Sequence, residues 1–347
     1  MPPAYYLMAK RLILSTLNQD MAPVFPPAFL PSKVPPREEP GSQALGAGGV
    51  AFYVDQWILS AKEEEEYKLK WDGIRYNQFA SDRISVRRHI PDDREAGCKK
   101  FKYDLKELEK TSVIIPFHNE PYTVILRLVH SILDRSPPEL LEEVILVDDN
   151  SSWVRVFGGE RPSLPAKVER HRILSLQSRQ NTPTKPLDDY VAQLEGKVKI
   201  VRLEKRSGLI QAKLKGADAA RGPVLTFLDV HTECFPGWLE PLLNEIKINI
   251  RTAISPIIVY VDGTTLEMKN WPSSHIEWGS FTWDMYFDTR PPPQANQMRP
   301  GGPYSAINTS TIAGGMFSIH RDFFEELGRY DSKFEIWGGE NLELSFK

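Results

Sequence analysis

Short apolar runs alternate with helical stripes from Thr111 onward, and this alternation constrains the fold more than any other feature of the sequence. The runs have the length of buried strands, and they cover residues 113–115, 144–147, 198–201 and 224–228. One face of a helix between the first two runs is predicted by the spacing of Ile125, Leu128, Val129, Ile132 and Leu133. A second helical stripe before the last run consists of Ile210, Leu214 and Ala217. Alternating strands and helices predict an α/β fold with a mostly parallel sheet.

Three aspartates stand at the ends of two predicted strands. Asp148 and Asp149 follow the run 144–147, and Asp229 follows the run 224–228. In open α/β sheets, ligands bind outside the carboxyl ends of the strands. We therefore expect these carboxylates to lie at a ligand site on that edge of the sheet.

The composition excludes several classes of protein. The chain has 347 residues with 43 basic and 46 acidic side chains, and this balance argues against a broadly basic nucleic-acid binder. Only two cysteines, Cys98 and Cys234, exclude a four-cysteine zinc site and a small disulfide-stapled domain. No run of about 20 apolar residues occurs, so we expect no membrane span. Met1 to Leu17 lacks the order of basic, apolar and small residues that is typical of a signal peptide.

The chain divides into three parts by composition. Residues 1–50 are rich in proline and glycine and are expected to form a stem or linker that does not pack. Residues 51–110 precede the α/β pattern, which covers 111–347. Within it, residues 153–184 show no sustained period and are interpreted as an insertion, because loops of this length are uncommon in compact domains.

The pair Asp229 and His231 is a candidate metal site. A carboxylate and an imidazole two residues apart point the same way from extended backbone, just after a buried strand. One oxygen and one nitrogen ligand suit Mn²⁺, which also accepts phosphate oxygens. A diphosphate leaving group needs such a cation to absorb its developing charge. The alternative is a capping aspartate beside an exposed histidine.

Other polar residues at the same edge suit a nucleotide. Asp149 could accept from a uracil N–H or a ribose hydroxyl, or it could simply form a turn at the strand end. Arg206, at the start of the next predicted helix, could bind a diphosphate together with the helix amides, or it could be a surface arginine beside a turn. His118, Asn119 and Glu120 follow the first strand, where they could face a ligand or cap the helix that begins near Pro121.

Two C-terminal segments carry unusual residues. The glycine pair Gly314–Gly315 in an apolar run predicts the close approach of another group to the backbone. Residues 337–341, read as WGGEN, combine an aromatic ring, flexible glycines, a carboxylate and an amide. This set suits a sugar, although a plain loop could also contain it. The aromatic cluster of Trp278, Phe281 and Trp283 could instead belong to the core.

Several strings follow one another in a recognisable order: TSVIIPFHNE, SPPELLEEVILVDDNSS, VLTFLDVHTECFPGWLEPLL, TIAGGMFSIHRDFFEELGRYD and IWGGENLELSF. The string SDRISVRRHIPD, between Tyr76 and Asp93, precedes them. Through these strings the chain from Thr111 to Lys347 resembles the catalytic domain of polypeptide N-acetylgalactosaminyltransferases.

The resemblance implies a GT-A glycosyltransferase fold with a mixed, mostly parallel sheet flanked by helices, incomplete at the C-terminus. Such enzymes transfer GalNAc from UDP-GalNAc to Ser or Thr of polypeptides with retention of configuration. Their cofactor is Mn²⁺, and they start mucin-type O-glycosylation in the Golgi apparatus. The implied partners are acceptor peptides or proteins, with no nucleic acid and no membrane span in this chain.

The resemblance also assigns roles to individual residues. It implies Asp229 and His231 as Mn²⁺ ligands. It places Glu340 and Asn341 in the catalytic site as contacts of the donor sugar. The remaining positions are donor-binding residues, Asp149, Arg206, Gly315 and Trp337, and residues of the acceptor groove, Phe281 and Trp283.

The chain also departs from the family pattern. The third metal ligand of the family, a histidine, and its lectin domain are expected beyond Lys347, and the family's membrane anchor is missing from the N-terminus. Cys98 resembles a cysteine whose partner lies beyond the chain end, so we expect an unpaired thiol. Pro116 stands where threonine is common, and Gln211 and Lys213 stand where arginine is common.

These departures leave a second interpretation open. The chain could be an impaired or inactive family member that acts as a non-catalytic nucleotide-sugar binding protein or a partner protein. Two Asn-x-Ser/Thr motifs also occur, Asn150-Ser151-Ser152 and Asn308-Thr309-Ser310. A glycan on Asn150 would crowd Asp149, so we expect that motif to be unused.

Overall fold

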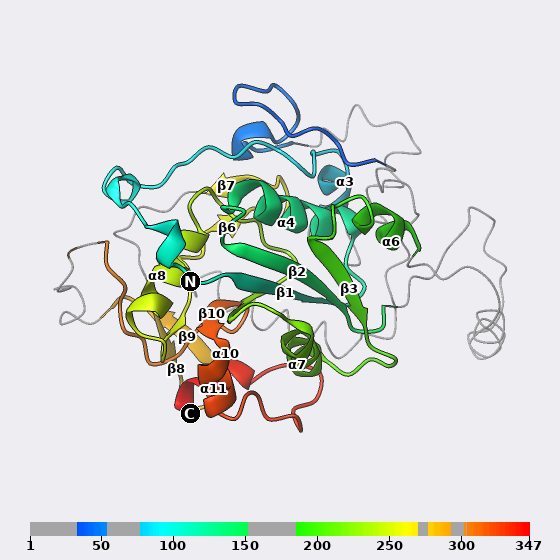
Figure 1. Cartoon of the computed structure of the whole chain (residues 1–347). Coiled ribbons are helices and arrows are strands. Elements are labelled where there is room, and N and C mark those ends of the chain that lie inside the picture. The colour runs from blue at the N-terminus through cyan, green and yellow to red at the C-terminus, as the bar shows by residue number, and fades with distance from the viewer. Residues whose placement is uncertain (1–32, 54–76, 152–184, 270–276, 293–301, 303) are drawn as a thin grey trace, which may run out of the picture.

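A six-stranded sheet forms the centre of the computed structural model (Figure 1), which describes residues 33–53, 77–151, 185–269, 277–292, 302 and 304–347. The spatial order of the strands is β3-β2-β1-β4-β10-β5. Their bounds are β1 Thr111–Phe117, β2 Leu141–Asp148, β3 Val198–Arg202, β4 Val224–Leu228, β5 Ala253–Ile254 and β10 Met316–His320. Four of the strands match the apolar runs expected from the sequence.

The sheet is mixed and mostly parallel, as predicted. Strands β3, β2, β1 and β4 pair in parallel, whereas β10 runs antiparallel to both β4 and β5. All seven residues of β1 are buried, because helices cover both faces of a parallel sheet. Pro116 lies in this central strand, but the pairing of β1 with β4 ends at Ile114. The proline lies beyond the end of that ladder, so its missing N–H interrupts no β1–β4 pair.

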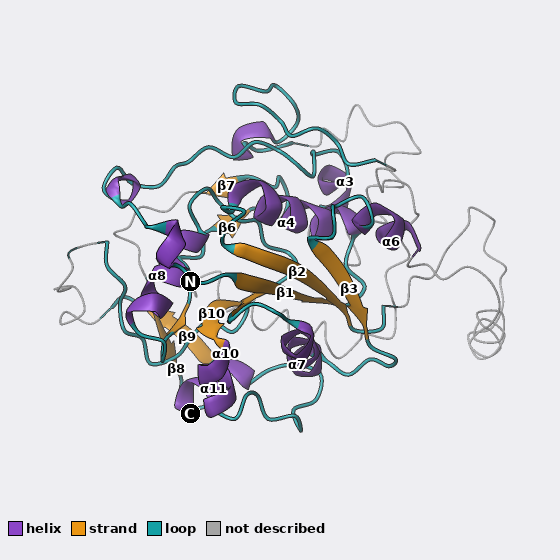
Figure 2. Cartoon of the chain, in the orientation of Figure 1, coloured by secondary structure: helices purple, strands orange, loops and turns teal. Residues whose placement is uncertain are grey.

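Two helical layers enclose the sheet, as Figure 2 shows. On one face, α4 (Tyr122–Arg135) and α6 (Lys185–Val191) pack against Ile115 and Leu146. The other face is covered by α7 (Leu209–Ala219) and α10 (Arg321–Glu326). Gly216 in α7 allows the helix to lie close to the sheet, because a Cβ atom there would be 2.3 Å from Ile114 Cγ2.

Smaller elements surround this layered core. The remaining helices are α8 (Leu239–Ile248), α11 (Glu340–Phe346), α3 (Gln78–Ser81) and the short 3₁₀ turns η1 (Ala47–Gly49), η3 (Cys98–Lys100) and η4 (Leu105–Glu107). Two hairpins pair β6 (Tyr260–Val261) with β7 (Met268–Lys269), and β8 (Trp278–Phe281) with β9 (Phe287–Arg290). None of the described helices is both long and apolar enough to cross a bilayer.

The last third of the proline-rich segment 1–50 packs against the protein, which differs from the expectation of an unpacked linker. Glu38 N donates to Arg87 O at 3.1 Å, and Gly48 N donates to His89 O at 2.8 Å. Val34 also packs against the apolar core on the α4 face. These contacts fix residues 33–49 through backbone hydrogen bonds that composition does not reveal. Residues 1–32 of the predicted stem lie outside the described residues, and so does the predicted insertion at 153–184.

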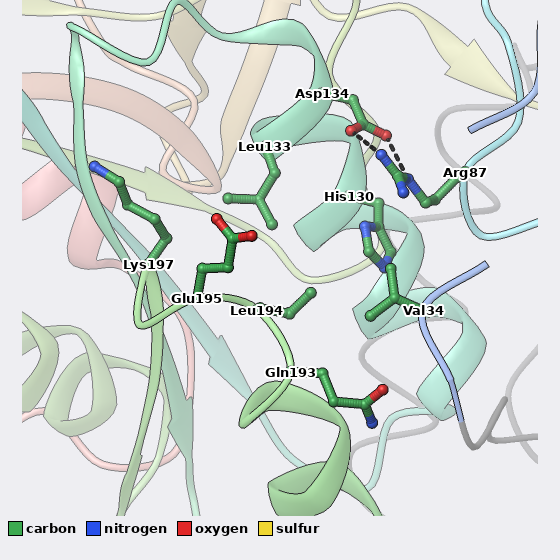
Figure 3. Close-up of a pocket in the computed structure, with 9 residues that line it drawn as sticks. All are labelled: Val34, Arg87, His130, Leu133, Asp134, Gln193, Leu194, Glu195 and Lys197. Carbon is green, nitrogen blue, oxygen red and sulfur yellow. Dashed lines mark hydrogen bonds and ion pairs between the residues drawn. The ribbon is translucent and has the colours of Figure 1, made fainter. Parts of the chain in front are cut away.

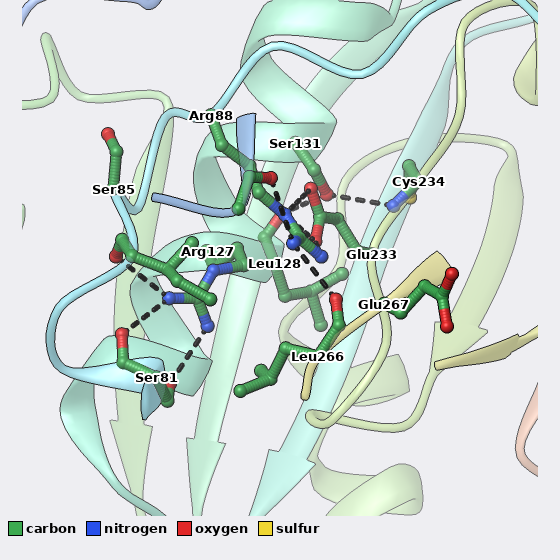
Figure 4. A network of polar contacts seen from close by, with 12 residues as sticks. Ser81, Ser85, Arg88, Arg127, Leu128, Ser131, Glu233, Cys234, Leu266 and Glu267 are labelled. Atoms are coloured by element: carbon green, nitrogen blue, oxygen red, sulfur yellow. Dashed lines mark hydrogen bonds and ion pairs between the residues drawn. The ribbon is translucent and has the colours of Figure 1, made fainter. Parts of the chain in front are cut away.

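A buried ionic network joins the early segments to the loop after β4, as Figure 4 shows. The Glu233 carboxylate accepts from Arg88 Nη2 at 2.8 Å and from Arg135 Nη2 at 3.1 Å. The Arg88 guanidinium also donates to the backbone oxygens of Gly46 and Leu266. Two guanidinium groups and satisfied hydrogen bonds offset the cost of burying these charges.

Cys98 and Cys234 are both free thiols, in agreement with the expectation for Cys98. Burial raises the pKa of the Cys98 thiol and raises that of Cys234 to about 12. Because the thiolate is the reactive form, neither cysteine is activated in this environment.

Candidate active site

The polar residues predicted at the sheet edge do lie together at the carboxyl ends of β1, β2 and β4. His118 follows β1, Asp149 follows β2 and Asp229 follows β4. His118 Nδ1 lies 2.7 Å from the backbone oxygen of Asp149, and Asn119 Nδ2 lies 3.0 Å from His118 Nε2. Burial lowers the pKa of His118, so the ring is neutral near pH 7 and Nδ1 donates to Asp149. This pair ties the ends of β1 and β2 together.

Asp149 has a structural role that the sequence left open. Its carboxylate accepts from Ser207 N at 2.6 Å and from Gly208 N at 2.8 Å, and the residue is 5 % exposed. The Asp149 carboxylate therefore joins the end of β2 to the start of α7, a contact that neither sequence interpretation of this residue included. Each carboxylate oxygen has one such bond and retains capacity to accept another.

The start of α7 differs from the predicted diphosphate site. Leu209 N donates to Ile336 O at 2.8 Å, and the two preceding amides are bonded to Asp149. These three amides are therefore occupied within the protein, and a diphosphate contact through Arg206 stays a prediction. Gly208 is required at this place, because a Cβ atom would lie 2.5 Å from Ile336 Cα and its φ is +94°. Arg206 remains at the start of this turn, beside the same edge.

Gly315 confirms the close approach predicted from the glycine pair. A Cβ atom on Gly315 would lie 2.2 Å from Asp229 Oδ2. Asp229 N also donates to Gly315 O at 2.8 Å, just before the antiparallel pairing of β10 with β4. The Asp229 carboxylate thus lies directly over the backbone of Gly315, which precedes β10 rather than lying within it.

The Asp229 carboxyl is in an electrostatically unfavourable place. Burial raises its pKa above the usual value. The positive charges of His231 and Lys213 oppose the shift, and the negative charges of Glu340 and Glu120 add to it. An additional cation at this place would favour the ionised carboxylate.

His231 lies beside Asp229 at the same edge. Its Nδ1 is 3.9 Å from Glu120 Oε1. Loss of hydration lowers the pKa of the imidazole, but the contact with Glu120 and the charge of Asp229 outweigh this and raise the pKa to about 9. Because 61 % of the His231 side chain is exposed, solvent screens this attraction and reduces the shift. The exposed ring is accessible to a ligand from solution.

The two residues predicted as metal ligands both lie just after β4. Across the described part of the chain, no group of three or more His, Cys, Asp and Glu side chains has the geometry of a metal site. Asp229 and His231 nevertheless provide the oxygen and nitrogen donors that the sequence predicted, at the carboxyl end of β4.

Glu340 contacts the buried Lys213. In the sequence, Lys213 was noted only because it stands where arginine is common in the family. Lys213 Nζ lies 3.3 Å from Glu340 Oε1 and donates to Gly314 O at 2.9 Å. The Lys213 side chain is 1 % exposed and that of Glu340 is 7 % exposed. The sequence did carry a sign of this contact: a lysine within the apolar helix face of Ile210 and Leu214 needs a buried carboxylate partner.

Asn341 and Trp337 flank Glu340 in different environments. Asn341 Nδ2 donates to Ile312 O at 3.2 Å, so the amide already fixes the chain before the glycine pair. Trp337 is 52 % exposed, and its neighbour Ile336 contacts the start of α7. The WGGEN segment therefore lies at the same edge as Asp149 and Asp229.

The two aromatic residues predicted for an acceptor groove differ in their packing. Trp283 is 98 % exposed, so a core role for this side chain is wrong. Phe281 packs against Phe346 of α11, with ring centroids 5.1 Å apart. Trp278 is anchored through Nε1, which donates to Asn308 O at 2.8 Å.

A separate pocket of about 260 Å³ lies at the amino end of β3, as Figure 3 shows. It is lined by Val34, Arg87, His130, Leu133, Asp134, Gln193, Leu194, Glu195 and Lys197. The Arg87–Asp134 ion pair closes one side, at 2.6 Å. None of the predicted site residues lines this pocket, so it is distinct from the edge that carries Asp149 and Asp229.

Comparisons with known proteins agree with this arrangement. The sequence model of "Glycosyl transferase family 2" matches residues 112–153 and 177–328, which is more than half of the chain. Polypeptide N-acetylgalactosaminyltransferase 5 of Caenorhabditis elegans is 42 % identical over 322 residues, which cover 92 % of this chain and 47 % of the relative. Polypeptide N-acetylgalactosaminyltransferase 13 of Homo sapiens is 43 % identical over 291 residues, which cover 84 % of this chain and 47 % of the relative.

A solved structure extends the comparison to three dimensions. The crystal structure of GalNAc-T7 with UDP, GalNAc and Mn²⁺ aligns with a TM-score of 0.73 and 31 % identity, over 93 % of this chain and 55 % of that chain. The predicted GT-A fold is thereby confirmed. The chain spans about half the length of the curated relatives that it matches. It belongs to glycosyl transferase family 2, and its predicted resemblance to the polypeptide N-acetylgalactosaminyltransferases is confirmed.

Proposed function

We propose that this chain forms the catalytic domain of a retaining glycosyltransferase that transfers GalNAc from UDP-GalNAc to Ser or Thr of polypeptides. One observation carries the proposal: Asp149, Asp229, His231 and Glu340 lie at one edge of a GT-A sheet. The similar proteins are named polypeptide N-acetylgalactosaminyltransferases, and one of them was solved with UDP, GalNAc and Mn²⁺.

Asp229 and His231 are the residues that would hold Mn²⁺. Their oxygen and nitrogen donors suit this ion. The raised pKa of Asp229 supports the fit, because a cation would relieve the cost of a half-buried carboxylate near the negative charges of Glu340 and Glu120. When bound, Mn²⁺ would neutralise charge on the diphosphate of the donor.

The remaining edge residues would bind and orient UDP-GalNAc. Asp149 keeps acceptor capacity for the nucleoside, and Arg206 and Trp337 lie beside the same edge for contacts with UDP. Gly315 leaves room next to Asp229 for the sugar, since any side chain there would displace the carboxylate. Lys213 fixes the Glu340 carboxylate at 3.3 Å, which orients it with little further loss of side-chain entropy. Asn341 would complete the sugar contacts.

The acceptor would bind along the β8–β9 hairpin. Trp283 offers a large apolar ring at 98 % exposure, and Phe281 is supported from behind by Phe346. Such rings contact an extended peptide at low entropic cost. A transferase of this kind would work in the Golgi lumen, where its polypeptide acceptors pass.

A second candidate function is binding of the nucleotide sugar without transfer. It is favoured by the presence of only two clustered metal donors, Asp229 and His231, among the residues that the structure describes. A nucleotide-sugar binding or partner protein needs affinity for UDP but no complete set of charge-stabilising groups.

Calorimetric titration with UDP, with and without Mn²⁺, followed by transfer to a Ser/Thr peptide, tests the proposal. Binding that requires Mn²⁺ together with transfer supports the enzyme, whereas such binding without transfer favours the second candidate. Asp229→Asn should abolish the Mn²⁺ dependence, and Asp322→Asn is a matched control because Asp322 is 82 % exposed on α10. Absence of UDP binding by protein shown to be folded would contradict both functions.

A further inference from the structure

Two glycan acceptor motifs occupy very different places in this fold. Asn-x-Ser/Thr is the motif for N-glycosylation, and it occurs at Asn150 and Asn308. We propose that Asn308 carries an N-linked glycan and that Asn150 does not. The inference rests on the proposed function, because a transferase that works in the Golgi lumen must pass through the compartment where this modification occurs.

Asn308 lies in an irregular loop that is anchored through its backbone and its neighbours. Trp278 Nε1 donates to Asn308 O at 2.8 Å. The hydroxyls of Thr309 and Ser310 donate to Gly279 O at 2.8 and 3.0 Å. All three residues of the motif are nevertheless exposed. A glycan on Asn308 would therefore extend into solvent from a fixed segment without displacing the core.

Asn150 lies in a tight turn at the donor edge. Its φ is +53°, and although Asn150 itself is exposed, it directly follows Asp149, which is 5 % exposed. The next residue, Ser151, donates through its backbone N–H to Asp148 Oδ1 at 2.8 Å and accepts at Oγ from Asn119 N at 2.9 Å. A bulky glycan in this turn would cover the carboxyl ends of β1 and β2, so the fold accommodates it poorly.

Asn308 and Phe281 lie at opposite ends of β8. Its backbone contacts Trp278, the first residue of β8, whereas Phe281 is the last residue of that strand. Three strand steps separate these two positions by about 10 Å. The glycan would thus start at the opposite end of β8 from Phe281.

The modification is a group transfer from a lipid-linked oligosaccharide diphosphate. The amide nitrogen of Asn308 forms a bond to the anomeric carbon of the first sugar and loses a proton. The bond between that carbon and the diphosphate oxygen breaks, and the lipid diphosphate leaves with the electron pair. The host's oligosaccharide transferase catalyses this step, so no residue of the present chain needs to act as a catalyst.

The test is secretion of the full chain, directed by an added signal, from a eukaryotic host. Intact mass and peptide mapping are measured before and after peptide N-glycosidase, which converts a glycosylated asparagine to aspartate. We expect one glycan at Asn308, lost in Ser310→Ala. The matched control Thr309→Ala removes the neighbouring hydroxyl but keeps Asn-x-Ser, so it should keep the glycan.

Two outcomes overturn the inference: secreted, folded protein with no glycan at Asn308, or a glycan found on Asn150. The readout is a mass, so it does not depend on activity. Mn²⁺-dependent UDP binding, measured on the same glycosylated sample, reports separately on the proposed function. A glycosylated protein that fails to bind UDP would leave the modification intact while contradicting the proposed enzyme.

Discussion

Two acidic residues that follow β4 lie four positions apart and have opposite electrostatic surroundings. Glu233 is enclosed by Arg88 and Arg135, and these partners hold the pKa of its carboxyl below the usual value despite the burial. Asp229 has the reverse shift: burial raises its pKa, and Glu340 and Glu120 add to the effect.

The opposite pKa shifts indicate a structural role for the charge of Glu233 and a functional role for that of Asp229. Glu233 is satisfied by protein partners in Figure 4, so its charge stabilises the loop that carries both residues. Asp229 is only partly compensated by the charges of His231 and Lys213, so a ligand that brings positive charge would favour its ionised form further. Perturbed carboxyls at a sheet edge are candidates for function on this ground, whereas a doubly paired carboxyl is not.

The largest change in unfolding free energy is expected from removing the Glu233 carboxylate from its ionic network. Glu233→Ala leaves Arg88 and Arg135 buried without their counter-ion, which should cost about 3–5 kcal/mol of unfolding free energy. Urea denaturation measures the change. Glu142→Ala is the control, because Glu142 is 27 % exposed and its surface ion pairs should contribute less than about 1 kcal/mol. Equal losses in the two variants would contradict a special role for the network.

Asp229→Asn removes the unsatisfied charge instead. The folded state should be about as stable as the wild type, because desolvation and the charges of Glu340 and Glu120 already disfavour ionisation of this half-buried carboxyl. Mn²⁺-dependent UDP affinity should fall at least tenfold, which corresponds to about 1.4 kcal/mol. Denaturation and calorimetry on one sample measure both quantities. A large loss of stability with unchanged UDP affinity would reverse the assignment of the two carboxylates.

Gly315→Ala tests whether the position of Asp229 matters, and not only its charge. The new Cβ would lie 2.2 Å from Asp229 Oδ2, so the carboxylate must shift. We expect a loss of UDP affinity of about tenfold in the presence of Mn²⁺, with about 1–3 kcal/mol of destabilisation from overpacking. Gly196→Ala is the control for UDP binding, since nothing lies within 4 Å of a Cβ atom there; its φ of +71° adds a backbone cost to stability alone. Unchanged binding in Gly315→Ala would show that the site tolerates displacement of Asp229.

The two pKa shifts also predict opposite dependences on pH. The lowered pKa of Glu233 contributes stability above its unfolded value of 4.5, and this contribution is lost as the pH falls through the folded value. The raised pKa of Asp229 contributes stability below its unfolded value of 3.8, which is lost as the pH rises. Between pH 7 and pH 4, Glu233→Gln should therefore lose less unfolding free energy than the wild type. Parallel pH profiles from denaturant melts at each pH would show that Glu233 is not the linked group.

The sequence predicted the parts of this molecule that depend on local patterns. Apolar runs located β1 to β4, and strand ends located Asp149 and Asp229, because burial and chain direction fix both. The contacts of Asp149 with the start of α7 could not be predicted, since they join residues 58 and 59 positions apart. The packing of residues 33–49 was missed because backbone hydrogen bonds leave no signature in a Pro- and Gly-rich composition.

Buried Lys213 shows the same limit at the site itself. Its side chain reaches Glu340 across 127 positions, so local periodicity predicted only an interruption of an apolar stripe. Charge pairs of this kind follow from tertiary geometry, and one sequence does not specify which carboxylate a buried lysine meets. The aromatic hairpin was ambiguous for a related reason, because exposure of a tryptophan depends on what packs over it.

The smallest change in unfolding free energy is expected from substitution of Trp283. A residue that affects binding but not stability has a functional role and no structural one. Because Trp283 is 98 % exposed, Trp283→Ala should change the unfolding free energy by less than about 0.5 kcal/mol. Phe281→Ala removes a ring 5.1 Å from Phe346 and should cost about 0.5–1.5 kcal/mol. Both variants should weaken binding of a Ser/Thr peptide, titrated in the presence of UDP and Mn²⁺. If Trp283→Ala leaves peptide affinity unchanged while Phe281→Ala loses only stability, the hairpin is a structural element and the acceptor must bind elsewhere.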